Sequence, residues 1–324
     1  MQPPPKFFSS CATGSGYVFN INELPKRCDI LIVGQFALDR DVGVLVDVED
    51  ESTIKILTEA NKNVYLSIGF IFHEDWCSIL NALDENEYKT RIFDPLVGFL
   101  NKYKLGGLFM CIPDMLNGAI ENVSQKINDF VTSVKNNVDG LKVGLAFYVT
   151  DQISNKTSID FTLINEIMDH YIIDFTNLNS CNNNTKKYGL NPICSDTMPS
   201  IEQITGVVTN SNMDQSKLFA KLQANVIIPE DLVSKDEITV TTYSKYCDDS
   251  VDTSRWCGNP SKLSYDQGAY VAQFYSGLYI ENLDADDFEC KCGCKKFPVT
   301  NFIIDGWTNS DFTACPKIDS IKPK

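Results

Sequence analysis

The sequence predicts an α/β protein folded as a single (β/α)8 barrel domain, a TIM barrel, over residues 1–324. Eight short apolar runs occur along the chain, and segments with helical spacing of apolar residues separate them. The length suits a barrel of about 250 residues with insertions. A doubly wound open sheet has the same alternation, so periodicity alone leaves that architecture open.

The predicted strands and helices alternate in order. The apolar runs lie at residues 6–11, 29–33, 63–69, 107–112, 142–149, 171–178, 224–229 and 277–283. Most are continuously apolar, which is typical of parallel strands covered on both faces. Helical spacing appears at residues 54–60, 92–100, 120–134, 159–167, 218–222 and 270–274. Two further stretches exceed a minimal barrel: a hairpin expected within residues 42–48, after strand 2, and a disulfide-containing loop insertion at residues 230–262, after strand 7.

Charge and hydropathy exclude several classes of partner. The chain has 43 acidic and 28 basic side chains, a net charge of −15, and no basic run longer than a pair. Nucleic acid and acidic membrane surfaces require clustered Lys and Arg, so neither is an expected partner. No stretch approaches the roughly 20 apolar residues of a membrane helix, so no membrane insertion is expected. Residues 1–5 lack signal-peptide features, so any signal peptide is expected to be already removed or absent.

Cysteines and sequons indicate an extracellular, secreted glycoprotein. The chain has 12 cysteines and three N-glycosylation sequons, at Asn122, Asn155 and Asn183. Cysteines alternate in the segment from Cys290 to Cys294. Zinc ligands usually have the wider Cys-x-x-Cys spacing, so we expect these cysteines to join separate disulfides. Neither a metal site nor a cofactor is expected.

Four segments carry a family resemblance. Residues 28–37 are a cysteine followed by an apolar run ending in Phe-Ala, and residues 64–69 are Val-Tyr-Leu-Ser-Ile-Gly. Residues 173–177 are Ile-Asp-Phe-Thr-Asn, and residues 283–288 are Leu-Asp-Ala-Asp-Asp-Phe, followed by Cys-Gly and Phe-Pro. In motif, order and spacing the chain resembles the family-18 glycoside hydrolases, the chitinases and chitinase-like proteins, particularly those of arthropods. The resemblance implies a (β/α)8 barrel and does not alone imply activity.

The resemblance also implies that the catalytic motif is lost. The family's fourth strand carries Asp-Gly-x-Asp-x-Asp-x-Glu, whose Glu protonates the glycosidic oxygen while an Asp holds the attacking acetamido group. Here the carboxylate positions are Gly106, Phe109, Cys111 and Pro113. Proline cannot donate a proton, and a general acid is typically worth about 10²–10⁴ in rate. Because strand side chains alternate, we expect Phe109 and Cys111 to point inward.

The remaining substrate positions of the family have changed as well. Where the family has Met-Thr-Tyr-Asp, this chain has Asn179, Ser, Cys181 and Asn182, without the Tyr and the carboxylate. The Trp that stacks on the sugar corresponds to Glu281, which cannot supply that contact. Asp114 lies one residue past the acid position, and a bulge there could return a carboxyl group to the cleft. We favour the interpretation that Asp114 is an ordinary loop residue after a proline.

Other candidate residues follow from the same comparison. The disulfide candidates are Cys11 with Cys28, which the family implies, and two local pairs, Cys181 with Cys194 and Cys247 with Cys257. Candidates for a ligand groove at the strand ends are Phe70, Phe72, Tyr148, Asn179, Glu281 and Trp307. The acidic residues Asp284, Asp286 and Asp287 beside Glu281 could hold Ca²⁺. The family counterpart is largely structural, so we favour a capping role for them.

These observations predict a secreted, catalytically inactive chitinase-like protein that acts as a binding or interaction scaffold. Its partner, protein or glycan, is not identified by the sequence. The resemblance implies the range of growth, remodelling, immune and host-interaction roles. The insertion after strand 7 is too short for the large α+β domain of many family members. Two alternatives stay open: a lectin for chitin oligosaccharides, and a storage or structural secreted protein.

Overall fold

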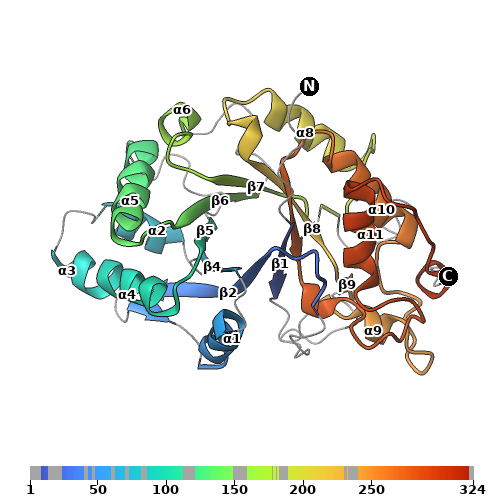
Figure 1. The fold of residues 1–324 in the computed structure, drawn as a ribbon. Coiled ribbons are helices and arrows are strands. Elements are labelled where there is room, and N and C mark those ends of the chain that lie inside the picture. Colours follow the sequence, from blue (N-terminus) through green and yellow to red (C-terminus); the bar gives the residue numbers. More distant parts are fainter. Residues whose placement is uncertain are drawn as a thin grey trace. The chain divides into compact units, whose positions relative to one another are not determined.

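The computed structural model describes residues 9–13, 24–39, 43–45, 48–59, 63–69, 73–81, 86–111, 121–148, 159–176, 178–179, 181, 189–229, 232 and 240–320. The chain divides into two compact units (Figure 1). Unit 1 consists of residues 1–28, 175–206 and 220–324, and unit 2 of residues 29–174 and 207–219. Among the described helices, none is both long and apolar enough to cross a bilayer.

Unit 2 is built around a parallel sheet. Its central strands lie side by side in chain order: β2 (Ile30–Asp39), β4 (Asn63–Gly69), β5 (Gly107–Cys111), β6 (Lys142–Tyr148) and β7 (His170–Asp174). Each is parallel to its neighbour, and the register places Phe109 of β5 beside Gly144 of β6. The start of β8 (Leu218–Gln223) lies beside β7.

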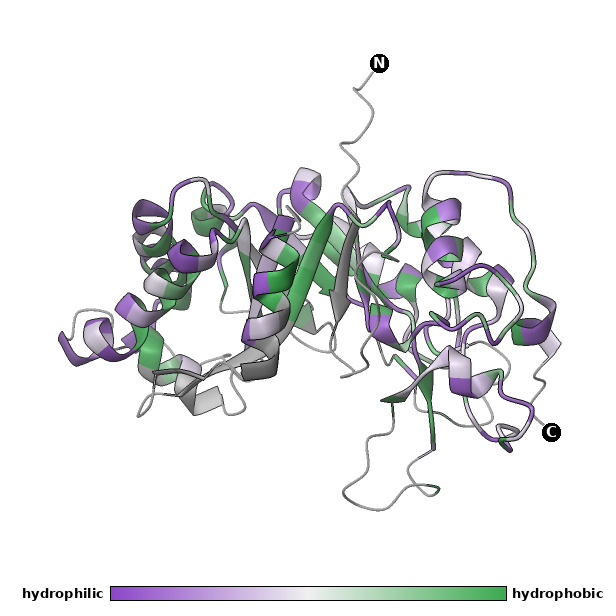
Figure 2. Ribbon diagram, turned by 60° about the horizontal axis from the view of Figure 1, so that its bottom comes forward, coloured by the Kyte–Doolittle hydropathy of each residue, from purple (hydrophilic) through white to green (hydrophobic). Residues whose placement is uncertain are grey.

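Helices follow the strands of unit 2 along the chain. They are α1 (Val48–Glu59), α2 (His73–Asn81), α3 (Asn86–Tyr88), the π-helix Lys89–Phe93, α4 (Asp94–Tyr103), α5 (Val123–Asn137), α6 (Phe161–Ile164) and the 3₁₀ turn Gln215–Lys217. The helix α5 buries Ile127, Phe130, Val131 and Val134, the apolar positions at helical spacing in the sequence. Figure 2 shows hydrophobic strands and helices that carry both hydrophilic and hydrophobic residues.

Unit 1 contains the chain's first and last strands as parallel neighbours. β1 (Ser9–Thr13) pairs with β11 (Gly277–Glu281), and β11 lies beside β8. A small antiparallel sheet joins β9 (Val226–Ile227) to β10 (Val240–Thr241). The helices are α8 (Ile201–Thr209), which ends in unit 2, α9 (Tyr243–Tyr246), α10 (Ser261–Val271), α11 (Pro298–Trp307), α12 (Pro316–Ser320) and the 3₁₀ turn Leu283–Ala285.

The alternation of parallel strands and helices is a (β/α)8 TIM-like fold, as the sequence predicts. The expected hairpin after the second strand is confirmed, since β3 (Gly43–Leu45) runs antiparallel to the end of β2. The insertion at residues 230–262 contains β10 and α9, and residues 230–231 and 233–239 lie outside the described part of the chain.

Two predictions near the seventh strand of the barrel are wrong. The segment predicted as a helix at residues 218–222 is strand β8, and the strand predicted at residues 224–229 is reduced to the two residues of β9. Leu218 and Leu222 are four residues apart, a spacing that places side chains on one face of either a helix or a strand. Lys221 and Gln223 are both buried in the strand. Because they are polar, they interrupt the continuous apolar run by which a buried strand is recognised in a sequence.

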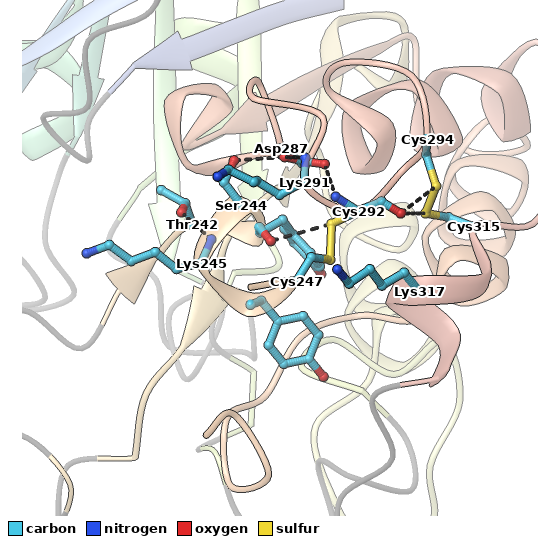
Figure 3. Close-up of a disulfide and its surroundings, with 12 residues drawn as sticks. Thr242, Ser244, Lys245, Cys247, Asp287, Lys291, Cys292, Cys294, Cys315 and Lys317 are labelled. Atoms are coloured by element: carbon cyan, nitrogen blue, oxygen red, sulfur yellow. Dashed lines mark hydrogen bonds between the residues drawn. A yellow bond between two sulfur atoms is a disulfide. The ribbon is translucent and has the colours of Figure 1, made fainter. Parts of the chain in front are cut away.

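Three disulfides join pairs of described cysteines in unit 1, and they correct both local pairings. The bridges are Cys181 with Cys257, Cys247 with Cys292, and Cys294 with Cys315. Backbone hydrogen bonds between Cys257 and Ile227 hold Cys257 beside β9, within reach of Cys181 and away from Cys247. Figure 3 shows Cys247, just after α9, bonded to Cys292. Cys194 is exposed and free.

The prediction for the alternating cysteines, Cys290 to Cys294, is confirmed only in part. Cys292 and Cys294 belong to separate disulfides, as expected, whereas Cys290 is free. Cys28 is disulfide-bonded. The side chain of Cys11, its predicted partner, lies outside the described residues.

A cluster of rings fills the interior of unit 2. The centroid of Phe109 lies 5.4 Å from that of Tyr65 and 6.1 Å from that of His170. His170 in turn contacts Phe219 edge-on at 4.6 Å. These four residues occupy β4, β5, β7 and β8, so their rings link four strands of the sheet, across β6, which lies between β5 and β7. Gly144 leaves the space that the ring of Phe109 fills, because a Cβ there would lie 2.3 Å from two carbons of that ring.

We predict that Gly144→Ala lowers the free energy of unfolding by about 1–3 kcal/mol, because the added methyl group overpacks the ring cluster. Gly98→Ala in α4 is the matched control, since a Cβ there meets no atom within 4 Å. It should stabilise the protein by about 0.5–1 kcal/mol through helix propensity. Urea denaturation measures both variants, and equal effects would contradict the packing described.

A second prediction concerns pH. Burial lowers the pKa of His170 to about 4 from its usual 6.5. The unfolded chain therefore binds this proton first, and His170 supports stability fully above about pH 6.5 and loses that support as pH falls toward 4. The loss is of the order of 3 kcal/mol. His170→Phe should show a correspondingly shallower fall in the urea midpoint over this range; identical pH profiles would be the opposing result.

Candidate functional site

The strand β5 carries no carboxylate in its described residues. Phe109 is fully buried in the ring cluster, which confirms that it points inward. Gly106 precedes β5, and a Cβ there would lie 2.0 Å from the side-chain oxygen of Asn63. An aspartate at position 106 would therefore have to displace Asn63. Pro113 and Asp114 lie outside the described residues.

Cys111 is at the end of β5, beside the end of β4. Its Sγ lies 3.6 Å from the hydroxyl oxygen of Ser67, and its carbonyl oxygen accepts a 3.0 Å hydrogen bond from the indole of Trp76. Cys111 is not in a disulfide. Cys111 therefore presents a thiol beside the hydroxyl of Ser67, and no carboxyl group takes part in this contact.

An ion pair occupies the strand ends of unit 1. The Nζ atom of Lys221 on β8 lies 2.7 Å from Oε1 of Glu281 on β11, and the side chains are 6% and 20% exposed. The same Nζ lies 5.4 Å from the centroid of the Tyr279 ring. Sequence reasoning found Glu281 and missed Lys221, because it assigned Lys221 to a helix. The presence of a lysine within the run Leu218–Gln223 was the sequence signal for it.

Hydrogen bonds fix the backbone around this pair. The amide of Phe175 donates to the carbonyl oxygen of Lys221 at 3.0 Å, and the amide of Ala224 donates to that of Glu281 at 3.0 Å. Just beyond the strands, the side-chain amide of Asn282 donates to Oδ1 of the buried Asn225 at 3.0 Å. The two charges are thus held on rigid elements rather than on loops.

Contacts within unit 1 hold the segment that the sequence resemblance aligns with the family's Met-Thr-Tyr-Asp motif. Asn179 is buried, and both its backbone amide and its side-chain amide donate to the carbonyl oxygen of Leu190, at 3.2 and 3.3 Å. Cys181 is bonded to Cys257. Asn182 lies outside the described residues. The described contacts of Asn179 and Cys181 are therefore structural.

The aromatic groove candidates are not brought together by the described structure. Trp307 is the last residue of α11 and is 9% exposed, so it belongs to a helix and little of its side chain is open to a ligand. The backbone of Tyr148 ends β6, and its side chain lies outside the described residues, as do Phe70 and Phe72. Their place in a ligand groove stays a prediction.

Buried aspartates after β11 cap backbone groups, as favoured from the sequence. Asp286 accepts hydrogen bonds from the amides of Val299 and Thr300 in the first turn of α11, at 3.3 and 2.8 Å. Burial raises the pKa of Asp286 to about 7. Figure 3 shows Asp287 among its donors, the Ser244 hydroxyl and the Lys291 and Cys292 amides.

Two further predictions concern metal binding and glycosylation. Across the described residues, no group of three or more His, Cys, Asp or Glu side chains is arranged to hold a metal ion. Asn122, a predicted glycosylation site, is exposed and precedes α5 with a left-handed backbone. Asn155 and Asn183, the other two sequons, lie outside the described residues.

Comparisons with known proteins support the fold. No protein-family model and no curated protein sequence matches the chain. Among solved structures, catalytic domain 2 of the Ostrinia furnacalis Group II chitinase has a TM-score of 0.71 at 14% identity, with 95% of this chain and 98% of that chain covered. A class V chitinase from Nicotiana tobaccum has a TM-score of 0.72 at 9% identity, covering 93% of this chain and 98% of that one.

A third similar structure is human YKL-39, described as a pseudo-chitinase with retained chitooligosaccharide binding properties. Its TM-score is 0.70 at 13% identity, with 93% of this chain and 99% of that chain covered. At such identities, likeness establishes the fold and nothing finer. The chain thus has the (β/α)8 fold that is found in family-18 chitinases and in chitinase-like proteins.

Proposed function

We propose that this chain is a secreted, catalytically inactive chitinase-like protein whose barrel serves as a scaffold for binding a protein or glycan partner. The observation that carries the proposal is the inner face of β5, which presents Phe109 and Cys111, the residues that the sequence resemblance aligns with family carboxylates. Phe109 is locked between Tyr65 and His170, so its ring cannot simply swing away to admit water or substrate.

Inactivity follows from the chemistry of glycoside hydrolysis. The leaving sugar needs a proton from a group with a suitably raised pKa, and the attacking acetamido group needs a carboxylate partner. The described inner face of β5 offers a ring and a thiol for these tasks. Losing the general acid alone costs about 10²–10⁴ in rate.

The ion pair argues against the usual sugar platform. A pyranose stacks on a flat apolar ring, and Glu281 at that position is instead bound to Lys221 at 2.7 Å. Separating the two charges to make room for a sugar would break a mostly buried ion pair, at a cost of several kcal/mol. The pair therefore favours a scaffold over a sugar-binding cleft of the family type.

Secretion is supported by covalent structure. Three disulfides join elements of unit 1, and structural disulfides persist in oxidising compartments. The chitooligosaccharide binding described for YKL-39 favours one second candidate, a lectin that uses rebuilt contacts. Such a lectin would need aromatic side chains at the strand ends, beyond the ion pair described here.

We predict that a fluorogenic chitobioside is not hydrolysed above a no-protein blank, because proton transfer has no donor on β5. An active chitinase assayed alongside is the control. Calorimetric titration with chitotetraose then separates scaffold from lectin: the scaffold gives no saturable heat up to millimolar sugar, and saturation near micromolar sugar would establish the lectin. Turnover that persists through repurification would refute the proposal outright.

The ion pair gives a prediction of its own. Lys221→Met should lower the free energy of unfolding by about 3–5 kcal/mol, because it leaves the mostly buried Glu281 without its cation. Lys221→Met combined with Glu281→Leu should recover most of that loss. The matched control is Lys317→Met, which removes a surface partner of Asp249 and should cost less than about 1 kcal/mol. Additive losses in the double variant would exclude a coupled pair.

A further inference from the structure

A pocket near the amino ends of β4 and β5 in unit 2 is lined by three lysines. Its volume is about 780 Å³, within the range of roughly 300–1,000 Å³ that is typical of small-ligand sites. Its walls come from the second half of α1, the first residue of β4 and the end of α4, which precedes β5. Lys55, Lys102 and Lys104 are all exposed, so a ligand in the pocket can reach their side chains.

Two of these lysines have unpaired amines. Among the described residues, none forms a hydrogen bond or an ion pair with the amine of Lys55 or of Lys104. Lys102 differs, because its Nζ lies 2.8 Å from Oε1 of Glu51, which also accepts a hydrogen bond from the Tyr103 hydroxyl. Two of the three amines are thus available to a ligand.

The pocket carries a surplus of positive charge. Against its three lysines, Glu59 is the one acid among the described residues that line it, and a surplus remains when Glu51 is counted with them. The chain as a whole has a net charge of −15, so the pocket has the opposite sign to the molecule. A concave site dominated by one sign of charge concentrates ligands of the opposite sign. The charges therefore favour an anion.

Helix stability alone does not explain the positions of Lys55 and Lys104. A lysine in the last turn of a helix interacts favourably with the helix dipole, but Lys55 precedes the last turn of α1. Lys104 ends α4 with a left-handed backbone, φ 50°, a conformation that favours glycine. The carbonyl groups there do not need its amine, because the amide of Lys104 donates to Asn101 at 3.2 Å and the amide of Leu105 to Leu100 at 3.0 Å.

We propose that this pocket binds the oxyanion of a phosphate or sulfate monoester, with the amines of Lys55 and Lys104 donating hydrogen bonds to its oxygens. An ammonium group has three donors and no acceptor, and hydrogen bonds between charged partners are the stronger ones. The volume leaves room for the organic part of the ester beside Tyr103. The pocket lies within unit 2, at the opposite end of β5 from Cys111, and does not depend on the proposed scaffold function.

The test uses saturation-transfer NMR on the full chain at low ionic strength with three probes: phenyl phosphate, phenyl sulfate and the uncharged phenol. We expect saturable binding of at least one ester and none of phenol. Lys55→Gln and Lys104→Gln should each weaken ester binding roughly two- to fivefold. Glu59→Gln should strengthen it, because the substitution removes the acid that lines the pocket. The ester that binds more tightly identifies the class of ligand.

The matched control is Lys89→Gln, at another exposed lysine that has no partner among the described residues and lies outside this pocket. It should leave ester binding unchanged. Glutamine keeps the helix propensity of lysine, and urea denaturation checks that every variant is folded. The proposal is overturned if neither ester binds, if phenol binds as well as the esters do, or if Lys89→Gln weakens binding as much as Lys55→Gln does.

Discussion

Phe109 packs against Tyr65 and His170 in the interior of unit 2, and the chemistry of the barrel depends on this apolar contact. The register pairs Phe109 with Gly144, whose missing side chain leaves room for the ring. A carboxylate in the place of Phe109 would lie among aromatic rings and would have to be protonated or paired. The packing that links β4, β5, β7 and β8 thus leaves no place for an ionised acid at residue 109.

The strand ends of unit 1 contain a charged pair rather than an apolar ring cluster. There Lys221 and Glu281 retain charge in a mostly buried setting, and each neutralises the other at 2.7 Å. Buried pairs of this kind contribute little net stability but resist the removal of one partner. The surrounding backbone hydrogen bonds hold both residues on strands. Unit 2 therefore has an apolar ring cluster in its interior, whereas unit 1 has a self-paired ion pair.

The sequence predicts the barrel well because continuous apolar runs and helical periodicity are local properties. The strand predicted at residues 63–69 coincides with β4, and the apolar face predicted from Ile127 to Val134 is the buried face of α5. The prediction is wrong at β8. Leu218 and Leu222 are four residues apart, which fits both the helical period and the strand period. It also fails for Cys181 and Cys247, since disulfide partners depend on which loops meet in space. Lys221 was missed for the first reason, because the segment that contains it was predicted as a helix.

The central claim is that the strand ends offer neither a proton donor nor a platform for an N-acetylglucosamine ring. A crystal structure determined after soaking with chitotetraose tests it most directly. The account predicts an intact Lys221 to Glu281 contact and no sugar density at the strand ends. A sugar ring stacked there, with a carboxyl group in hydrogen-bonding distance of a glycosidic oxygen, would contradict it.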